Sequence, residues 1–179
     1  MQIQIVLEYI EGTNLFHWIK QNRLAEEEKT RRLFREICKI VSYMHSRGIV
    51  HRDIKLENIM MSVAPSSQAK KRQSRPGSGA QGAADLHSSV THDISNVQPK
   101  LIDFGLSKVL LPGERSADPY GTLAYCSPEI IAKKPHTTKT DVWSLGIVLY
   151  TMLTRRMPFI ANDEEQTKNN ILYRNLNFD

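Results

Sequence analysis

The sequence predicts an α+β fold in which helices predominate, and three patterns lead to that expectation. Apolar residues recur at steps of three and four between about Glu26 and Met44, which is the spacing of one buried stripe on a helix. A nearly continuous apolar stretch from Val142 to Leu153 is typical of a buried helix. Two short strand-like runs, residues 59–61 (IMM) and 100–102 (KLI), each adjoin a polar loop. We therefore expect a mainly helical body with a small amount of sheet.

The first part of the chain is expected to begin with a strand. Residues 1–9 (MQIQIVLEY) alternate between polar and apolar side chains and then become wholly apolar, which is typical of a strand that enters a core. Residues 11–14 (EGTN) have the composition of a turn, and residues 15–19 (LFHWI) predict a short helix. Gly48 is expected to cap the long helix that starts near Glu26, because glycine readily adopts the left-handed backbone of a helix end. Ile49-Val50 then predicts a short strand.

The second half of the chain is expected to be irregular before it becomes helical. Residues 106–135 are broken repeatedly by proline and glycine, which favours loops. Thr140 is expected to cap a helix over residues 142–151. Residues 164–176 predict a final amphipathic helix.

A change of composition marks an insertion between the two strand-like runs. Residues 62–99 are rich in Ser, Ala, Gln, Gly and Pro and show no hydrophobic period, so we expect them to be disordered. The basic run at residues 70–72 (KKR) is interpreted as part of this solvated loop rather than as a docking patch. We expect the flanking strands to lie side by side while the insertion loops out between them.

Composition and charge argue against several classes of protein. The apolar stretch from Val142 to Leu153 is shorter than the roughly 20 residues that a membrane-spanning helix needs, so no membrane segment is expected. Cys38 and Cys126 are far apart and predict neither a disulfide framework nor a zinc site. The net charge of +5 comes from scattered basic residues, so nucleic-acid binding is not expected. We expect a cytoplasmic protein, with the nucleus as an alternative.

Acidic and amide side chains occur in two short motifs, HRDIKLEN at residues 51–58 and DFG at residues 103–105. Phosphoryl transfer needs a carboxylate that accepts a proton from the attacking hydroxyl. It needs oxygen ligands for Mg²⁺, which prefers carboxylates and amide carbonyls, and a cation that offsets the charge of the transferred group. The residues with suitable chemistry are Asp53, Lys55, Asn58 and Asp103.

The order of these motifs resembles that of the eukaryotic protein kinases. Residues 51–58 match the catalytic loop of that family, with Ile54 in place of the usual leucine, and DFG follows. The SPE tripeptide at residues 127–129 stands where the family usually has Ala-Pro-Glu, and GTLAY (121–125) and DVWSLG (141–146) lie at fitting distances. The chain resembles a serine/threonine protein kinase, and within that group the calcium/calmodulin-dependent and AMP-activated kinase-like branches.

The resemblance implies ATP and Mg²⁺ as cofactors and Ser/Thr-containing proteins as substrates. Asp53 resembles the catalytic base, Lys55 the lysine that contacts the γ-phosphate, and Thr122 the threonine bonded to both. Asn58 and Asp103 resemble the two Mg²⁺ ligands. The Lys55 and Thr122 positions are features of serine/threonine kinases rather than tyrosine kinases.

The resemblance also implies which residues lie beside the nucleotide. Leu7 resembles the gatekeeper, and Glu8 and Ile10 resemble the hinge whose backbone binds adenine. Met60 falls where an apolar side chain lies under the adenine ring. Glu57 is also expected beside the nucleotide. Its charge is compatible with substrates that carry basic residues before the target hydroxyl.

Further positions are implied to be structural or regulatory. His51 is expected to be structural, and Asp141 resembles a buried residue that anchors the backbone of the catalytic loop. Glu129 resembles a glutamate whose arginine partner would lie beyond residue 179. Arg52 resembles an arginine that binds an anion of the activation segment.

Asp118 stands where many relatives carry the phosphate that this arginine binds. We therefore expect the Asp118 carboxylate to supply part of that charge, so that phosphorylation of the segment is not strictly required. Ser116 and Tyr120 are candidate phosphorylation sites. The regulator of the protein is not predicted.

The resemblance implies the mainly α-helical C-terminal lobe of the kinase fold, within a partial kinase domain over residues 1–179. Residues 1–10 would be the last strand and hinge of an N-terminal lobe that is largely missing, and the last helices would also be truncated. The further divisions are 11–61 for helices and catalytic loop, 62–99 for the insertion, 100–135 for DFG and activation segment, and 136–179 for the anchor helix and its successor. We expect these residues alone to transfer phosphate poorly or not at all. A catalytically dead scaffold that binds partners is the alternative.

Overall fold

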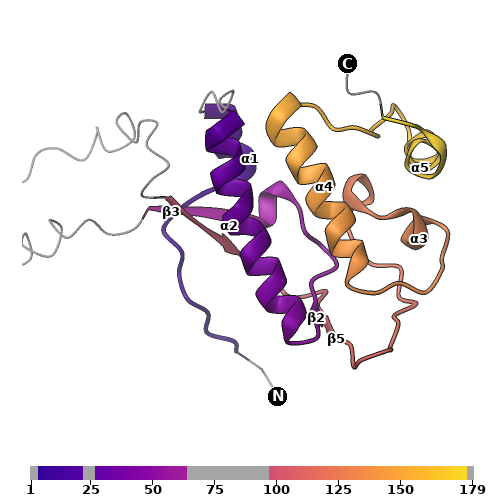
Figure 1. Cartoon of the computed structure of the whole chain (residues 1–179), viewed down its shortest axis with the longest axis horizontal. Coiled ribbons are helices and arrows are strands. Elements are labelled where there is room, and N and C mark those ends of the chain that lie inside the picture. Colours follow the sequence, from indigo (N-terminus) through magenta and orange to yellow (C-terminus); the bar gives the residue numbers. More distant parts are fainter. Residues whose placement is uncertain (1–3, 22–26, 64–96, 177–179) are drawn as a thin grey trace, which may run out of the picture.

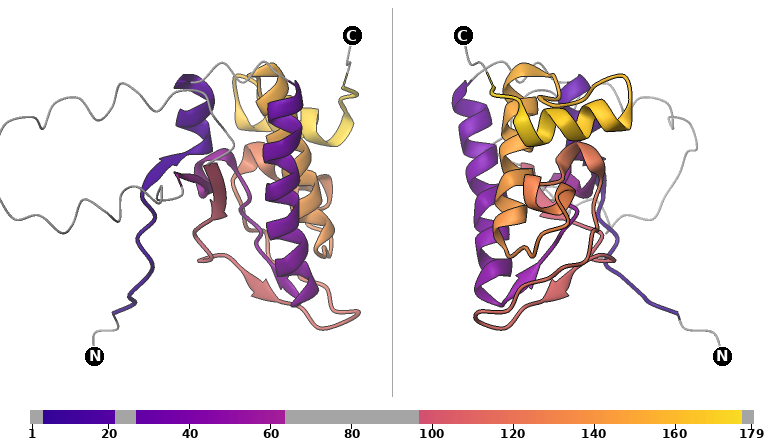
Figure 2. Two further views of the ribbon diagram at one scale, coloured as in Figure 1. Left: turned by 60° about the vertical axis from the view of Figure 1, so that its left-hand side comes forward. Right: turned by 90° about the vertical axis from the view of Figure 1, so that its right-hand side faces the viewer.

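The computed structural model describes residues 4–21, 27–63 and 97–176, and it shows a helical body beside small antiparallel sheets. In Figure 1, α2 (Glu27–Ser46) and α4 (Lys139–Thr154) lie side by side, with the larger sheet next to α2. In the same view, the short helix α3 (Pro128–Ile131) and α5 (Glu164–Tyr173) lie beyond α4, and Figure 2 shows these elements from two further directions. The predicted α+β fold is confirmed.

The first two helices form where the sequence predicted them. α1 (Leu15–Gln21) buries three residues, Leu15, Trp18 and Ile19. α2 buries four residues of the predicted apolar stripe, Leu33, Ile37, Val41 and Met44. Gly48 follows with a φ of 73°, and its N–H donates to the His45 carbonyl at 2.9 Å, so the expected glycine cap is confirmed.

Two small antiparallel sheets hold the loops that carry the polar motifs. The larger sheet has the order β1–β3–β4, formed by β1 (Gly12–Asn14), β3 (Ile59–Val63) and β4 (Val97–Leu101). The smaller sheet pairs β2 (Ile49–Val50) with β5 (Lys108–Val109).

The pairing of β3 with β4 confirms that the two strand-like runs lie side by side. Ile59 is opposite Leu101, and the register continues to Val63 opposite Val97. The strands therefore extend into both ends of the range 62–99 that we expected to be unstructured. The rest of that range, residues 64–96, lies outside the described residues.

Two predictions for the first part of the chain were wrong. Residues 4–10 form no strand, and Leu7 is 82% exposed, because no strand among the described residues lies beside them to complete a hydrogen-bonded ladder. Residues 12–14 form β1 instead of a turn and pair with β3. Gly12 permits this close approach, since a Cβ at that position would lie 2.2 Å from the Met61 carbonyl oxygen.

The region from residue 106 to residue 135 is less irregular than predicted. It contains β5, the short 3-10 helix η4 (Leu123–Tyr125) and α3. The predicted cap of the following helix was also wrong. α4 begins at Lys139, and Thr140 lies inside it, where its hydroxyl contacts Ser127 Oγ at 2.9 Å.

The last helix, α5, starts directly after Asp163, whose carboxylate accepts a hydrogen bond from the Gln166 N–H at 2.7 Å. This contact satisfies a backbone donor of the first turn, as an N-terminal cap does. The helix ends at Tyr173, three residues short of the predicted end at Leu176.

The core fixes the loop between β2 and β3. Ile54 and Leu56 are almost completely buried among side chains of the helices, whereas Lys55 and Glu57 between and after them are less buried. Burial of two large aliphatic side chains contributes roughly 3–6 kcal/mol, since each is worth about 1.5–3 kcal/mol. The polar side chains of the loop are thereby directed to its other side.

Across the part of the chain that the structure describes, no helix combines the length and apolar character needed to cross a bilayer. Cys38 and Cys126 are both free thiols.

Candidate active site

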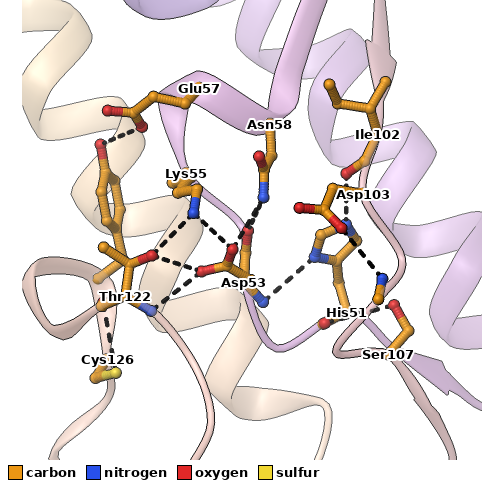
Figure 3. Close-up of polar contacts among 12 residues, drawn as sticks. His51, Asp53, Lys55, Glu57, Asn58, Ile102, Asp103, Ser107, Thr122 and Cys126 are labelled. Carbon is orange, nitrogen blue, oxygen red and sulfur yellow. Dashed lines mark hydrogen bonds and ion pairs between the residues drawn. The ribbon is translucent and has the colours of Figure 1, made fainter.

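The loop between β2 and β3 presents Asp53 to two flanking groups. One Asp53 oxygen, Oδ1, accepts hydrogen bonds from the Thr122 hydroxyl at 2.8 Å and from the Thr122 N–H at 3.1 Å. The other oxygen, Oδ2, accepts from Lys55 Nζ at 2.7 Å and from Asn58 Nδ2 at 3.1 Å. Lys55 Nζ also donates to the Thr122 hydroxyl at 3.0 Å, so Asp53, Lys55 and Thr122 form a closed triangle (Figure 3).

This environment keeps Asp53 ionised although the residue is only 7% exposed. Burial by itself raises the pKa of the carboxyl group, but hydrogen bonds from Lys55 and Thr122 outweigh it and lower the pKa below its ordinary value. Both carboxylate oxygens have donors, so the group is oriented as well as charged. Such a carboxylate suits the task of aligning a hydroxyl and accepting its proton late in a reaction.

The strand pair brings the second motif next to the first. The Ile102 N–H donates to the Asn58 carbonyl at 2.9 Å, which continues the β3–β4 ladder by one step and places Asp103 beside the loop that carries Asp53. Figure 3 shows the Asp53, Asn58 and Asp103 side chains in one neighbourhood, from two loops far apart in sequence. The two motifs therefore face each other across the strand pair.

His51 links the two loops. It is completely buried, its Nε2 lies 3.1 Å from the Ile102 carbonyl oxygen, and its ring packs edge-on against Phe104 at 5.0 Å between centroids. Burial lowers the pKa of the His51 imidazole, so the ring is neutral at physiological pH. His51 therefore packs between the two motifs and holds them together, as a structural residue does.

Asn58 and Asp103 offer oxygen ligands with the chemistry that Mg²⁺ prefers. The Asn58 side chain donates from Nδ2 to the Asp53 backbone carbonyl at 2.9 Å, which orients the amide and leaves its carbonyl oxygen for another partner. Asp103 is exposed, has a left-handed backbone (φ 63°) and accepts from the Gly105 N–H at 3.3 Å. Among the described residues there is no group of three or more His, Cys, Asp or Glu side chains that could hold a metal ion. Two protein oxygens suit Mg²⁺, because that ion usually takes its other ligands from phosphates and water.

Asp141, on α4, holds the backbone of the loop that carries Asp53. Its carboxylate is completely buried and accepts from the His51 N–H and the Arg52 N–H, each at 2.9 Å. His45 Nε2 lies 2.8 Å from the same carboxylate. Arg52 has a φ of 67°, a conformation that costs an ordinary residue about 1–3 kcal/mol, and the two backbone contacts stabilise it.

Arg52 also reaches the segment that contains Ser116 and Asp118. Its Nη1 donates to Asp118 Oδ2 at 3.0 Å and to the Ser116 hydroxyl at 3.3 Å. Lys108 Nζ lies 3.3 Å from the same Asp118 oxygen, and the Ser116 hydroxyl donates to it at 2.8 Å. The Ser116, Lys108 and Arg52 contacts lower the pKa of the Asp118 carboxyl to about 2.

The two candidate phosphorylation sites differ in accessibility. Ser116 is 1% exposed, and its backbone exchanges two hydrogen bonds with His136, at 2.9 and 2.8 Å. Tyr120 is exposed, and its ring lies 4.9 Å from the Arg52 guanidinium.

Two other predicted residues, Glu57 and Glu129, lie outside the triangle of Asp53, Lys55 and Thr122. Glu57 is exposed and contacts the Tyr125 hydroxyl at 3.5 Å. Burial raises the pKa of Tyr125, and the nearby Glu57 carboxylate adds to the effect. Glu129 is half-buried and has no side-chain hydrogen bond or ion pair within the described residues.

The predicted nucleotide-binding residues are not enclosed. Leu7 and Glu8 are exposed on the extended segment that precedes β1, and Ile10 and Met60 are half-buried. Glu8 forms an ion pair with Lys100 of β4 at 2.5 Å, which attaches the segment to the larger sheet. Their role toward adenine stays a prediction.

Sequence reasoning missed two residues of the site. His45 contacts Asp141 from the end of α2, and Lys108 contacts Asp118 from β5. Neither belongs to a motif, and both contacts join residues that only the fold brings together. The only signal in the sequence is that His45 directly follows Met44, the last buried residue of the apolar stripe of α2.

This arrangement defines the class to which the chain belongs. The protein kinase domain family matches residues 1–178, and the chain is a member of that family. Protein kinases use ATP and Mg²⁺, and the oxygen ligands described above fit that pair of cofactors.

Curated relatives of the chain carry kinase names. It is 32% identical to the DNA damage response protein kinase DUN1 of Saccharomyces cerevisiae, over 89% of this chain and 28% of that protein. It is 34% identical to the serine/threonine-protein kinase AtPK2/AtPK19 of Arabidopsis thaliana, over 90% of this chain and 27% of that protein. A third relative, the carbon catabolite-derepressing protein kinase of Candida glabrata, is 33% identical over 98% of this chain and 22% of its own length. The chain thus spans less than a third of each of these relatives.

Proposed function

We propose that the protein is a serine/threonine protein kinase that transfers the γ-phosphate of ATP to Ser/Thr hydroxyls of proteins. The observation that carries the proposal is the triangle of Asp53, Lys55 and Thr122, with Asp103 beside it across the β3–β4 pair. We further propose that the described residues are the C-terminal lobe of the kinase fold and that the protein acts in the cytoplasm.

Each residue of the site has a distinct task in this proposal. Asp53 orients the substrate hydroxyl and accepts its proton as the phosphorus–oxygen bond forms. Lys55 places a positive charge beside the transferred group, where negative charge develops. Thr122 fixes the Asp53 carboxylate through two hydrogen bonds to Oδ1. Bound Mg²⁺ would be held by Asn58 and Asp103 and would neutralise phosphate charge.

The choice of serine or threonine as acceptor rests on Lys55 and Thr122. These two side chains bond each other at 3.0 Å and both bond Asp53, so they work as one unit. Leu7, Glu8, Ile10 and Met60 are proposed to contact adenine, and Glu57 is proposed to favour a basic residue in the substrate.

The proposal is tested by Asp53→Asn in the complete protein, with transfer of labelled phosphate to a Ser-containing peptide as the readout. We expect the rate to fall about 100- to 10,000-fold, the range for loss of a general base. Asp163→Asn is the matched control, because asparagine also caps a helix and the residue lies at α5.

Nucleotide binding measured together with phosphate transfer distinguishes the kinase from a catalytically dead scaffold. A kinase is expected to bind ATP with Mg²⁺ in both the wild-type and the Asp53→Asn protein and to transfer phosphate at the full rate only in the former. Wild-type protein that binds nucleotide without transferring phosphate, under all conditions of phosphorylation, would contradict the proposal and favour the scaffold.

A further inference from the structure

Outside the candidate active site, the structure has a groove of about 480 Å³ between the exposed side of α2 and the start of β4. We propose that this groove docks an acidic segment of a partner protein that also carries apolar side chains. The groove contains none of the residues assigned to phosphate transfer, so the proposal does not rest on the proposed function. In Figure 1, α2 lies next to the sheet that forms the other wall.

Positive charge lines one wall of the groove. Arg32, Arg35 and Lys39 are exposed and follow one another at steps of three and four along α2, so they project from the same side of the helix. Lys39 is paired with Glu36 at 2.7 Å. Arg32 and Arg35 have no ion pair with any residue in the described ranges. Two such guanidinium groups are suited to bidentate contacts with carboxylates of a partner.

Apolar side chains form part of the groove floor, next to the exposed Gln98. Leu33 is 4% exposed, Pro99 is buried, and Ile40 and Val97 are half-buried at the edges. Inorganic phosphate or a nucleic-acid backbone would use the arginines but gain nothing from this floor. A peptide that alternates acidic and apolar side chains would use both, and this combination favours a protein partner.

The outer edge of β4 indicates how the partner is held. β4 is the edge strand of the described β1–β3–β4 sheet. The Ile102 N–H donates to the Asn58 carbonyl on the β3 side. In an antiparallel pair, successive residues of a strand direct their backbone hydrogen-bonding groups alternately toward and away from the neighbouring strand. The backbone groups of Pro99, three residues before Ile102, therefore face away from β3. Proline has no N–H to offer an added strand. We infer that the partner docks through side chains rather than by extending the sheet.

The test measures binding of a short fluorescein-labelled peptide of Glu-Leu repeats to the complete protein by fluorescence anisotropy. We expect saturable binding that Arg32→Glu combined with Arg35→Glu weakens by about 10-fold or more. Arg156→Glu and Lys134→Glu, combined in one protein, form the matched control, because both residues are exposed and lie outside the groove. The control is expected to bind like the wild-type protein.

Three comparison probes decide the chemistry of the site. A peptide with Ser in place of Leu and a peptide with Lys in place of Glu are both expected to bind about 10-fold more weakly or not at all. A single-stranded oligonucleotide is expected to bind no better than the Ser peptide. Equal binding of the oligonucleotide or the Ser peptide would show a general polyanion surface and overturn the proposal. So would binding that the groove variant does not weaken, or no binding of the Glu-Leu peptide up to about 1 mM.

Discussion

The buried carboxylate of Asp141 accepts a hydrogen bond from the backbone N–H of Arg52 at 2.9 Å and thereby holds a residue with a left-handed backbone. A second bond, from the His51 N–H, fixes the neighbouring peptide at the same distance. α4 therefore sets the position of the loop that carries Asp53, although the two elements are far apart in the chain. The geometry of the candidate site depends on this link.

We expect Asp141→Asn to destabilise the protein by about 2–4 kcal/mol, because it removes a buried charge and replaces one of the two oxygens that accept backbone N–H groups with an amide donor. Urea unfolding of the complete protein measures the free energy. Asp163→Asn, which retains a helix cap, is expected to change it by less than about 0.5 kcal/mol. Equal stability of the wild-type and Asp141→Asn proteins would contradict the anchoring role.

Asp118 is expected to order the activation segment without a phosphate. Asp118→Asn removes the charge that Arg52 and Lys108 share, so we expect faster backbone hydrogen exchange across residues 116–121. We also expect a lower rate of phosphate transfer by unphosphorylated protein. Asp118→Glu keeps the charge and should restore part of both properties. Full activity of Asp118→Asn would refute this account of regulation.

The same contacts predict a pH dependence of stability. The folded pKa of Asp118 is lowered to about 2 from an ordinary value of 3.8, so the ionised form is favoured in the folded protein. Its stabilising contribution is therefore fully present above the ordinary value and is lost as the pH falls toward 2. The difference in unfolding free energy between the wild-type protein and Asp118→Asn should be constant above about pH 5 and shrink below it. A difference that grows as the pH falls would have the wrong sign.

Thr122→Ala tests the positioning of the Asp53 carboxylate. The change removes the hydroxyl that bonds both Asp53 and Lys55, and we expect kcat to fall about 10- to 100-fold with little change in KM for ATP. Thr122→Ser keeps the hydroxyl and should recover most of the rate. Loss of ATP affinity in place of kcat would instead assign Thr122 to nucleotide binding.

Cys126 is expected to be an unreactive thiol. Burial raises its pKa to about 11, so little thiolate is present near neutral pH. Alkylation of the folded protein by iodoacetamide should label this residue slowly, and unfolding in urea should remove the protection. Rapid labelling of folded protein at pH 7 would show that the segment after Thr122 opens readily.

The sequence predicted the elements that show a continuous pattern of apolar residues along the chain. The α2 stripe, the apolar α4 helix and the strand pair around the insertion all follow from apolar spacing, and each is present in the structure. The motif residues Asp53, Asn58 and Asp103 were predicted by their types and order, and the β3–β4 register explains their proximity.

Contacts that depend on tertiary neighbours were not predicted. β1 forms because β3 offers it a partner, whereas the more strand-like residues 4–9 have none among the described residues. Thr140 pairs with Ser127 instead of capping α4. His45 and Lys108 join the site through residues distant in sequence, and no periodicity encodes such a pairing.

The most direct test of the proposed site is an anomalous diffraction map of the complete protein crystallised with Mn²⁺ and a non-hydrolysable ATP analogue. We expect a manganese peak within coordination distance of oxygens of Asn58 and Asp103, with the analogue's terminal phosphate facing Asp53. A metal and nucleotide bound elsewhere, or Asp53 and Asp103 directed to separate ligands, would contradict the account.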